Sequence, residues 1–187
     1  MRARRHPPPA LRLPPFTQRQ FRDALGHFAT GITIVTAARP NGTPVGMTAS
    51  SFNSVSMEPP LVLWSVTRKA LSAETFRTAP RFAIHVLGEA QVELANLFAR
   101  SGADKFGTTE HRFDAHGVPI LPDCVCRFDC RRFAVHPGGD HHIVVGEVLH
   151  VASGDEGAAG PGRVGRPLVY GAGAFATALP LGLPDPD

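Results

Sequence analysis

The sequence predicts a mainly β protein, a β-barrel with two or three flanking helices. Several short runs rich in β-branched and aromatic residues follow one another closely, with only two or three helical segments among them. Strands and helices do not alternate in a βαβ rhythm, which argues against a doubly wound parallel sheet. No Gly-x-Gly-x-x-Gly follows a predicted strand, so a Rossmann dinucleotide site is unsupported. The 187 residues, 43% of them hydrophobic, suffice for one core, and we expect a single domain over 17–179.

The two ends differ from this body in composition. Residues 1–16 form a Pro- and Arg-rich arm that we expect to be extended or disordered, and 180–187 are predicted to be a disordered tail. The first 22 residues hold six arginines and no acidic residue, which leaves thirteen basic against sixteen acidic residues in the rest. The basicity therefore belongs to the arm, and nucleic-acid binding is not favoured. Without a long apolar run or a signal-peptide pattern, we expect a cytoplasmic protein with no membrane segment.

The first elements are a helix and a hairpin. Thr17 and Gln20 have the spacing of a capping box, and Phe21, Leu25 and Phe28 follow at helical spacing, which predicts an amphipathic helix over 17–29. The β-branched run 32–37 predicts a strand, and the turn Pro40-Asn41-Gly42 pairs it with a strand beginning at Pro44.

The stretch from Pro44 to Pro60 opens like a strand and then fills with hydroxyl groups where a strand would bury apolar residues. Its small residues allow a flat ligand to approach the backbone, and its hydroxyl and N–H groups suit a phosphate or a carbonyl-rich ring such as flavin. On composition alone a polar loop between two strands is the better interpretation, so the binding-rim hypothesis depends on the rest of the chain.

The middle of the chain predicts two strand–helix pairs. The apolar run 61–66 reads as a buried strand, and Arg68 and Lys69 follow it just before a helix that Ser72 opens. These two cations are candidate phosphate-binding residues. The alternative is that they belong to an ordinary solvated loop. A strand over 82–87 and a helix over 89–100 come next, and His85, inside the apolar run, is predicted to be structural.

The last part of the chain predicts strands at 124–135, 143–148 and 167–171. Residues 117–122 are expected to be irregular, 136–142 to form a tight turn, 152–166 a flexible loop and 173–179 a closing segment. Cys124, Cys126 and Cys130 match neither a disulfide framework nor a zinc site and are predicted to be strand residues. His141 and His142 should point to opposite faces of a strand, so we expect no metal site and one inward imidazole.

Three segments together resemble the short-chain flavin reductases, the reductase components of two-component flavin monooxygenases. They are Phe28-Ala29-Thr30-Gly31-Ile32-Thr33-Ile34-Val35-Thr36, Gly46-Met47-Thr48-Ala49-Ser50-Ser51-Phe52 with Ser54-Val55-Ser56 and Pro59-Pro60-Leu61-Val62, and Gly139-Asp140-His141. The resemblance runs from about Phe21 to Phe175 and includes Asp104-Lys105-Phe106. It implies a split-barrel flavin-binding fold and a homodimer that takes hydride from NADH or NADPH and hands reduced FMN or FAD to an oxygenase partner.

The resemblance also implies roles for single residues. Those matched to the flavin ring and its ribityl chain are Gly46, Met47, Thr48, Ser50 and Ser51. Those matched to the phosphate segment are Ser65, Val66, Thr67, Arg68 and Lys69, with Phe98, Ala99, Arg100 and Lys105 nearby. His141 falls on the family histidine beside the nicotinamide, where it orients the donor or manages protons, and Tyr170 and Phe175 are matched to the same nicotinamide-binding site.

The sequence departs from the family at Gly171-Ala172-Gly173-Ala174, where many relatives carry an aromatic residue and an arginine. The choices between FMN and FAD and between NADH and NADPH therefore stay open. Two alternatives remain: a flavoprotein on the same barrel that retains its flavin, oxidase-like or heme-handling, and a nucleic-acid binder acting through the Arg-rich arm.

Overall fold

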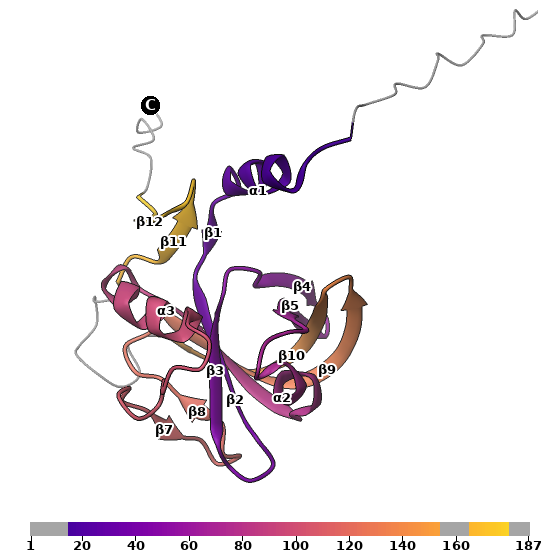
Figure 1. The fold of residues 1–187 in the computed structure, drawn as a ribbon. Helices are drawn as coiled ribbons and strands as arrows, with labels where there is room; N and C mark the ends of the chain where they lie inside the picture. The colour runs from indigo at the N-terminus through magenta and orange to yellow at the C-terminus, as the bar shows by residue number, and fades with distance from the viewer. Residues whose placement is uncertain (1–14, 154–164, 180–187) are drawn as a thin grey trace, which may run out of the picture.

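A seven-stranded antiparallel sheet forms the centre of the molecule (Figure 1). In this computed structural model residues 15–153 and 165–179 are described. The strands, in sheet order, are Pro44–Ala49 (β3), Thr33–Ala38 (β2), Arg81–Val86 (β6), Cys126–Gly138 (β9), His141–Ser153 (β10), Pro60–Thr67 (β5) and Asn53–Met57 (β4). The sheet curls until β3 contacts β5, yet no hydrogen-bonded ladder joins these two strands. The barrel is therefore split along this side, and the predicted fold class is confirmed.

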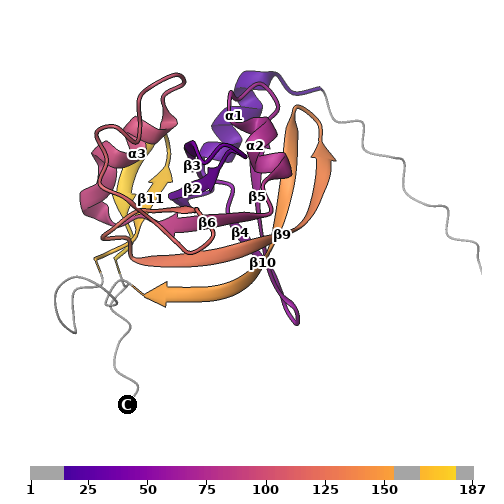
Figure 2. The same cartoon turned by 90° about the horizontal axis from the view of Figure 1, so that it is seen from below.

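Smaller elements surround the barrel (Figures 1 and 2). The helices are Gln18–Gly26 (α1), Ala73–Thr78 (α2) and Val92–Ala99 (α3), with a 3₁₀ turn at Glu89–Gln91 (η1). A three-stranded sheet contains Thr30–Gly31 (β1), Leu168–Gly171 (β11) and Ala174–Thr177 (β12), and a two-stranded one contains Arg112–Phe113 (β7) and Pro119–Ile120 (β8). The predicted irregular segment 117–122 and closing segment 173–179 thus each contribute a short strand.

Two apolar clusters hold these layers together. The first fills the barrel, where side chains that point inward from the strands pack against α2. In it, Trp64 packs edge-on against Phe76 with ring centroids 4.8 Å apart. The second lies between the barrel and α3 and includes Ile34, Leu87 and Phe98. Because Ile34 and Val35 alternate on β2, that strand contributes to both clusters. This double use explains why β2 is buried along nearly its whole length.

Helix α1 begins with the predicted capping box but is shorter than expected. The Thr17 hydroxyl accepts from the Gln20 N–H, and the Gln20 side chain accepts from the Thr17 N–H. The predicted end at residue 29 is wrong: the helix stops at Gly26, because Thr30 and Gly31 pair with β11 and the chain must extend to reach it. No residue of α1 is buried, and the helix stands beside the barrel rather than on it (Figure 1).

His85 is the structural histidine that the sequence predicts. Its side chain is fully buried. Its Nδ1 lies 3.1 Å from the Ile34 carbonyl oxygen, and the Leu121 N–H donates to its Nε2 over 3.1 Å. These partners require a neutral ring with the proton on Nδ1. Burial lowers the pKa of His85 from 6.5 to about 4.

The hydroxyl-rich stretch contains a strand that the sequence analysis did not predict. Strand β4 covers Asn53–Met57 at the edge of the main sheet, and all but one of its residues are exposed. An edge strand with so little burial can carry serines, which hides it from a search for apolar alternation.

The β9–β10 hairpin is much longer than predicted. The expected turn over 136–142 shrinks to Gly139 and Asp140, with Gly139 at a φ of 68°, as a two-residue hairpin turn requires. Strand β9 begins at Cys126 rather than 124, and β10 extends from His141 to Ser153. Two register shifts and several charged side chains interrupt the apolar alternation that the prediction relied on. Residues 1–14, 154–164 and 180–187 lie outside the described residues, and so do the expectations for most of the arm, most of the 152–166 loop and the tail.

Candidate functional site

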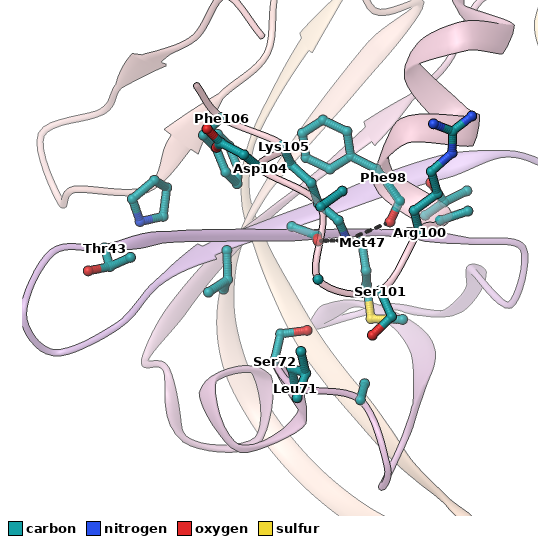
Figure 3. Close-up of a pocket in the computed structure, with 18 of the residues that line it drawn as sticks. Thr43, Met47, Leu71, Ser72, Phe98, Arg100, Ser101, Asp104, Lys105 and Phe106 are labelled. Carbon is teal, nitrogen blue, oxygen red and sulfur yellow. Dashed lines mark hydrogen bonds between the residues drawn. The ribbon is translucent and has the colours of Figure 1, made fainter. Parts of the chain in front are cut away.

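A pocket of about 660 Å³ opens between three segments that are distant in sequence (Figure 3). Strand β3 forms its floor, the segment after β5 forms one wall, and the segment from the end of α3 to Phe106 forms the other. The predicted cofactor residues that line it are Gly46, Met47, Thr48, Thr67, Lys69, Phe98, Ala99, Arg100 and Lys105. The fold thus brings together the residues that the sequence placed in three separate motifs.

Gly46 is required by packing within the protein. A Cβ at this position would lie 2.5 Å from Cε1 of Phe98 and 3.2 Å from Phe106. The hypothesis that Gly46 is small to admit a flat ligand is therefore incomplete, because the ring of Phe98 already occupies that space. The consequence for the site is that α3 sits directly on β3 and closes one end of the pocket.

Lys105 forms hydrogen bonds with two other segments of the protein. Its ammonium donates to the carbonyl oxygens of Gly46, at 3.0 Å, and Phe98, at 2.8 Å (Figure 3). Partial burial lowers the pKa of Lys105. These contacts fasten the pocket wall to β3, and they use two of the three donors of the ammonium group.

Two hydroxyl groups of the pocket differ in their availability. The Thr48 hydroxyl donates to the Ala95 carbonyl oxygen over 2.6 Å, so only its oxygen lone pairs face a ligand. Ser72 precedes α2, but its side chain makes no capping hydrogen bond. Its hydroxyl therefore lines the pocket as both a donor and an acceptor.

The charges of the pocket are predominantly positive. Lys69, Arg100 and Arg39 line it, and within the described residues none of their side chains makes a hydrogen bond or an ion pair. The one carboxylate of the lining, Asp104, already accepts from the Gly107 N–H over 2.9 Å. Such a pocket favours an anionic ligand. Its exposed Leu71, which lies next to Ser72 in Figure 3, adds an apolar surface.

Arg68 and His141 lie at the margin of this pocket and do not line it. His141 is the register partner of Thr67, a lining residue, so the two side chains share one face of the sheet. The Arg68 Nε donates to the His141 carbonyl oxygen over 3.3 Å, which ties the segment after β5 to the β9–β10 turn.

Asp140 orients the ring of His141. The Asp140 Oδ1 lies 2.7 Å from the His141 Nδ1, and this hydrogen bond lowers the pKa of Asp140. An ionised carboxylate can only accept, so the proton of the ring lies on Nδ1 and Nε2 is left available for a further partner.

Several predicted residues lie apart from the pocket. The Ser51 hydroxyl accepts from the Ser65 N–H over 2.9 Å, so these two residues bond to each other across the barrel edge. The side chain of Val66 is fully buried in the barrel core, so it cannot line the pocket. Ser50 does not line it either. Tyr170 and Phe175 pack against each other on β11 and β12, with centroids 5.3 Å apart.

Other lining residues were not predicted as site residues. They are Arg39, Thr43, Pro44, Val45, Ala70, Leu71, Ser72, Ser101, Gly102, Ala103, Asp104 and Phe106. The sequence assigned Ser72 to a helix start and placed Arg39 next to a hairpin turn, roles that say nothing about a ligand. Pro44 and Val45 carried a signal as the start of the hydroxyl-rich stretch, and Asp104 and Phe106 carried one through the Asp104-Lys105-Phe106 motif of the resemblance.

The described part of the chain contains neither a metal-binding cluster nor a membrane-spanning helix. No cluster of three or more His, Cys, Asp or Glu side chains is arranged to hold a metal ion among residues 15–153 and 165–179. Within the same ranges, no helix has the length and apolar character needed to cross a bilayer.

Comparison with known proteins agrees with this geometry. Residues 25–179 match the family model described as the flavin reductase like domain. The chain is 46% identical over 157 residues to an FMN reductase (NADH) of Agrobacterium fabrum, and the match covers 84% of each protein. It is 38% identical over 168 residues to the reductase component of a 4-nitrophenol 4-monooxygenase/4-nitrocatechol 2-monooxygenase of Rhodococcus opacus, covering 90% of this chain and 85% of that protein.

A solved structure shows the same fold. It is the NADH:FAD oxidoreductase of Streptomyces globisporus C-1027 in complex with NAD and FAD fragments, with a TM-score of 0.79 and 33% identity over 92% of this chain and 99% of that one. Three other curated relatives, from Rhizobium meliloti and Acinetobacter baylyi, are longer, and the chain spans between 43% and 58% of their length. With a family model that covers most of its length and a relative at 46% identity, the chain belongs to the flavin reductase-like family.

Proposed function

We propose that this protein is a flavin reductase that transfers hydride from NADH or NADPH to FMN or FAD and supplies the reduced flavin to a partner monooxygenase. The observation that carries the proposal is the pocket beside β3, where apolar side chains and the cations Arg39, Lys69, Arg100 and Lys105 outweigh the one carboxylate, Asp104. Family membership and relatives that are named as reductases and as reductase components support it.

The residues present fit a flavin nucleotide. Among the described residues, Lys69, Arg100 and the Ser72 hydroxyl have no hydrogen-bond partner, and they are donors of the kind that bind a phosphate. Met47 and Leu71 offer apolar surface for a flat ring. A bound flavin supplies the hydride acceptor, and the protein contributes binding, orientation and electrostatics. Lys105 takes part indirectly, by holding the wall against β3.

His141 is the proposed catalytic residue. Its ring is held by Asp140, with Nε2 free, at the margin of the pocket next to Thr67. From this position it can donate or accept a hydrogen bond beside the bound rings, which orients the nicotinamide or carries a proton. Tyr170 and Phe175 lie on the small outer sheet, and a role for them toward the nicotinamide is part of the same proposal.

The active form is proposed to be a homodimer. Helix α1 has nine residues, none of them buried, and such a short helix is marginal alone in water. Its exposed Phe21 and Leu25 continue into exposed Phe16 and Phe28, which gives one apolar face. A second copy of this chain covers that face.

The test is oxidation of NADH and of NADPH, followed at the nicotinamide absorbance band, with and without added FMN, FAD and riboflavin. We expect oxidation that depends on added flavin and saturates with it. No flavin-stimulated oxidation with either nucleotide would contradict the proposal.

The colour of the purified protein distinguishes the reductase from the alternative, a flavoprotein on the same barrel that retains its flavin. If the purified protein stays yellow through gel filtration and gains no activity from added flavin, the alternative holds. A colourless protein that turns over added flavin excludes it.

A further inference from the structure

A second pocket, of about 450 Å³, lies at the turn end of the β2–β3 hairpin. It is bounded by the end of α2, the start of β6 and the turn before β8. Arg39 is the one residue that lines both this pocket and the candidate flavin pocket. The second pocket is therefore a separate site on the barrel.

Its charged groups are all basic. Arg39, Arg81 and His116 line it, and no acidic residue does. Arg81 is partly buried, yet its guanidinium makes no hydrogen bond or ion pair with any described residue. Its register partner on β9 is Arg131, whose own charge is matched by Glu147 at 2.6 Å. Like charges directly opposite each other on neighbouring strands are destabilising, so an anion bound at Arg81 would relieve this repulsion.

Two acceptors in the segments that bound this pocket already accept hydrogen bonds. The Ala79 carbonyl oxygen at the end of α2 accepts from the Arg132 Nε over 3.1 Å. The Asp114 Oδ1 accepts from the backbone N–H groups of His116 and Val118, each over 2.8 Å. The Asp114 carboxylate thereby fixes the turn that carries His116, and among the described residues no group accepts a hydrogen bond from the Arg81 side chain.

The lining also defines the chemical class of the ligand. Two guanidinium groups and an imidazole offer more donors than one carboxylate can accept, and they suit the three oxygens of a phosphate monoester. Pro40, Pro80 and Val118 form apolar walls. The volume of about 450 Å³ exceeds what a bare phosphate needs and lies in the range of small-molecule sites. We propose that this pocket binds a small phosphorylated metabolite of nucleotide size, with Arg39, Arg81 and His116 holding its phosphate.

The experiment is calorimetric titration of the full chain with AMP and with adenosine, in the wild type and in four variants. Arg81→Gln and His116→Gln change the second pocket alone, and Lys69→Gln changes the candidate flavin pocket alone. Arg22→Gln, on α1, removes the same charge as Arg81→Gln far from both pockets. His116→Gln keeps the test sharp if Arg81→Gln fails to fold, because His116 lies in an exposed turn.

We expect AMP to bind at least about tenfold more tightly than adenosine, as the loss of one charge-assisted contact implies. Arg81→Gln and His116→Gln should each weaken AMP binding about fivefold or more, whereas Lys69→Gln and Arg22→Gln should leave that binding event unchanged. Inorganic phosphate should displace AMP from the same site. Binding of AMP that responds to Lys69→Gln alone, equal binding of adenosine, or no binding of AMP would each overturn the proposal.

Discussion

Two lysines of the candidate site carry the same charge in different surroundings. The ammonium of Lys105 is partly buried and donates to two carbonyl oxygens, whereas Lys69 has no hydrogen-bond or ion-pair partner among the described residues. We expect Lys105→Ala to lower the free energy of unfolding by roughly 2–4 kcal/mol, because two hydrogen bonds from a charged group are lost. Lys69→Ala should change it by less than about 0.5 kcal/mol. Urea unfolding followed by circular dichroism measures both.

Lys69→Ala, which should hardly affect stability, should affect ligand binding. Lys69→Ala should weaken FMN about tenfold and riboflavin hardly at all, because only FMN carries a phosphate. A Lys69→Ala protein that loses both ligands equally would place the phosphate elsewhere in the pocket, and one that loses stability would contradict the absence of internal contacts at Lys69.

His85 makes the stability of the fold depend on pH. Its pKa is about 4 in the folded protein and near 6.5 in the unfolded chain, so below pH 6.5 the unfolded state binds a proton that the folded state refuses. We expect the free energy of unfolding to fall as pH decreases from 6.5 to 4, by roughly 3 kcal/mol from this group. His85→Gln should start less stable at pH 7 and show a shallower decline in that window. Parallel curves for the two proteins would assign the pH dependence to other groups.

For single residues, the sequence identifies which ones line the candidate site better than it identifies what each one does there. Gly46, Phe98 and Lys105 were all predicted to bind the cofactor, and all three line the pocket. Their strongest contacts, however, are with one another: the Phe98 ring fills the space beside Gly46, and Lys105 bonds to both backbones. These contacts join positions up to 59 residues apart, and no local pattern reveals them.

Among the elements, the β9–β10 hairpin is the one whose register decides a role. His141 pairs with Thr67 at the candidate flavin pocket, and His142 pairs with Val66, whose side chain lies in the barrel core. We expect His141→Ala to reduce flavin-dependent NADH oxidation by about tenfold or more while flavin affinity stays within a few-fold. His142→Ala should leave the rate nearly unchanged. Steady-state kinetics with FMN titration gives both quantities.

Asp140→Asn tests how the ring of His141 is held in this hairpin. It keeps the size of the side chain but removes the charge that holds the His141 proton on Nδ1. Its rate should lie between those of the wild type and His141→Ala. A larger effect from His142→Ala than from His141→Ala would mean that the faces are exchanged.

Elements were predictable wherever one physical signal dominated. The β2–β3 hairpin follows from its β-branched strand and Asn-Gly turn, and α3 follows from its apolar face. Strand β4 was missed because an edge strand needs few apolar residues, and the ends of β10 were missed because register shifts break its alternation. The limits of α1 depended on β1 and β11, strands whose pairing spans most of the chain.

For the whole molecule, the open question is what covers α1. Thr17 and Gln20 cap the helix well, but capping contributes only about 1 kcal/mol and cannot hold nine residues in a helix without packing. Phe21 and Leu25, each more than half exposed, lie on one face of α1 as i and i+4 neighbours. A symmetric dimer that buries this face would supply the missing packing.

We therefore expect Phe21→Glu with Leu25→Glu to convert the protein from a dimer into a monomer, because two buried carboxylates cannot be accommodated in an apolar contact. Sedimentation velocity over a range of protein concentrations measures the change. Arg19→Glu with Arg22→Glu is the control, since it alters the charge of the same exposed helix and leaves Phe21 and Leu25 in place. A wild type that sediments as a monomer would contradict the dimer, and a double variant that stays dimeric would place the interface elsewhere on the barrel.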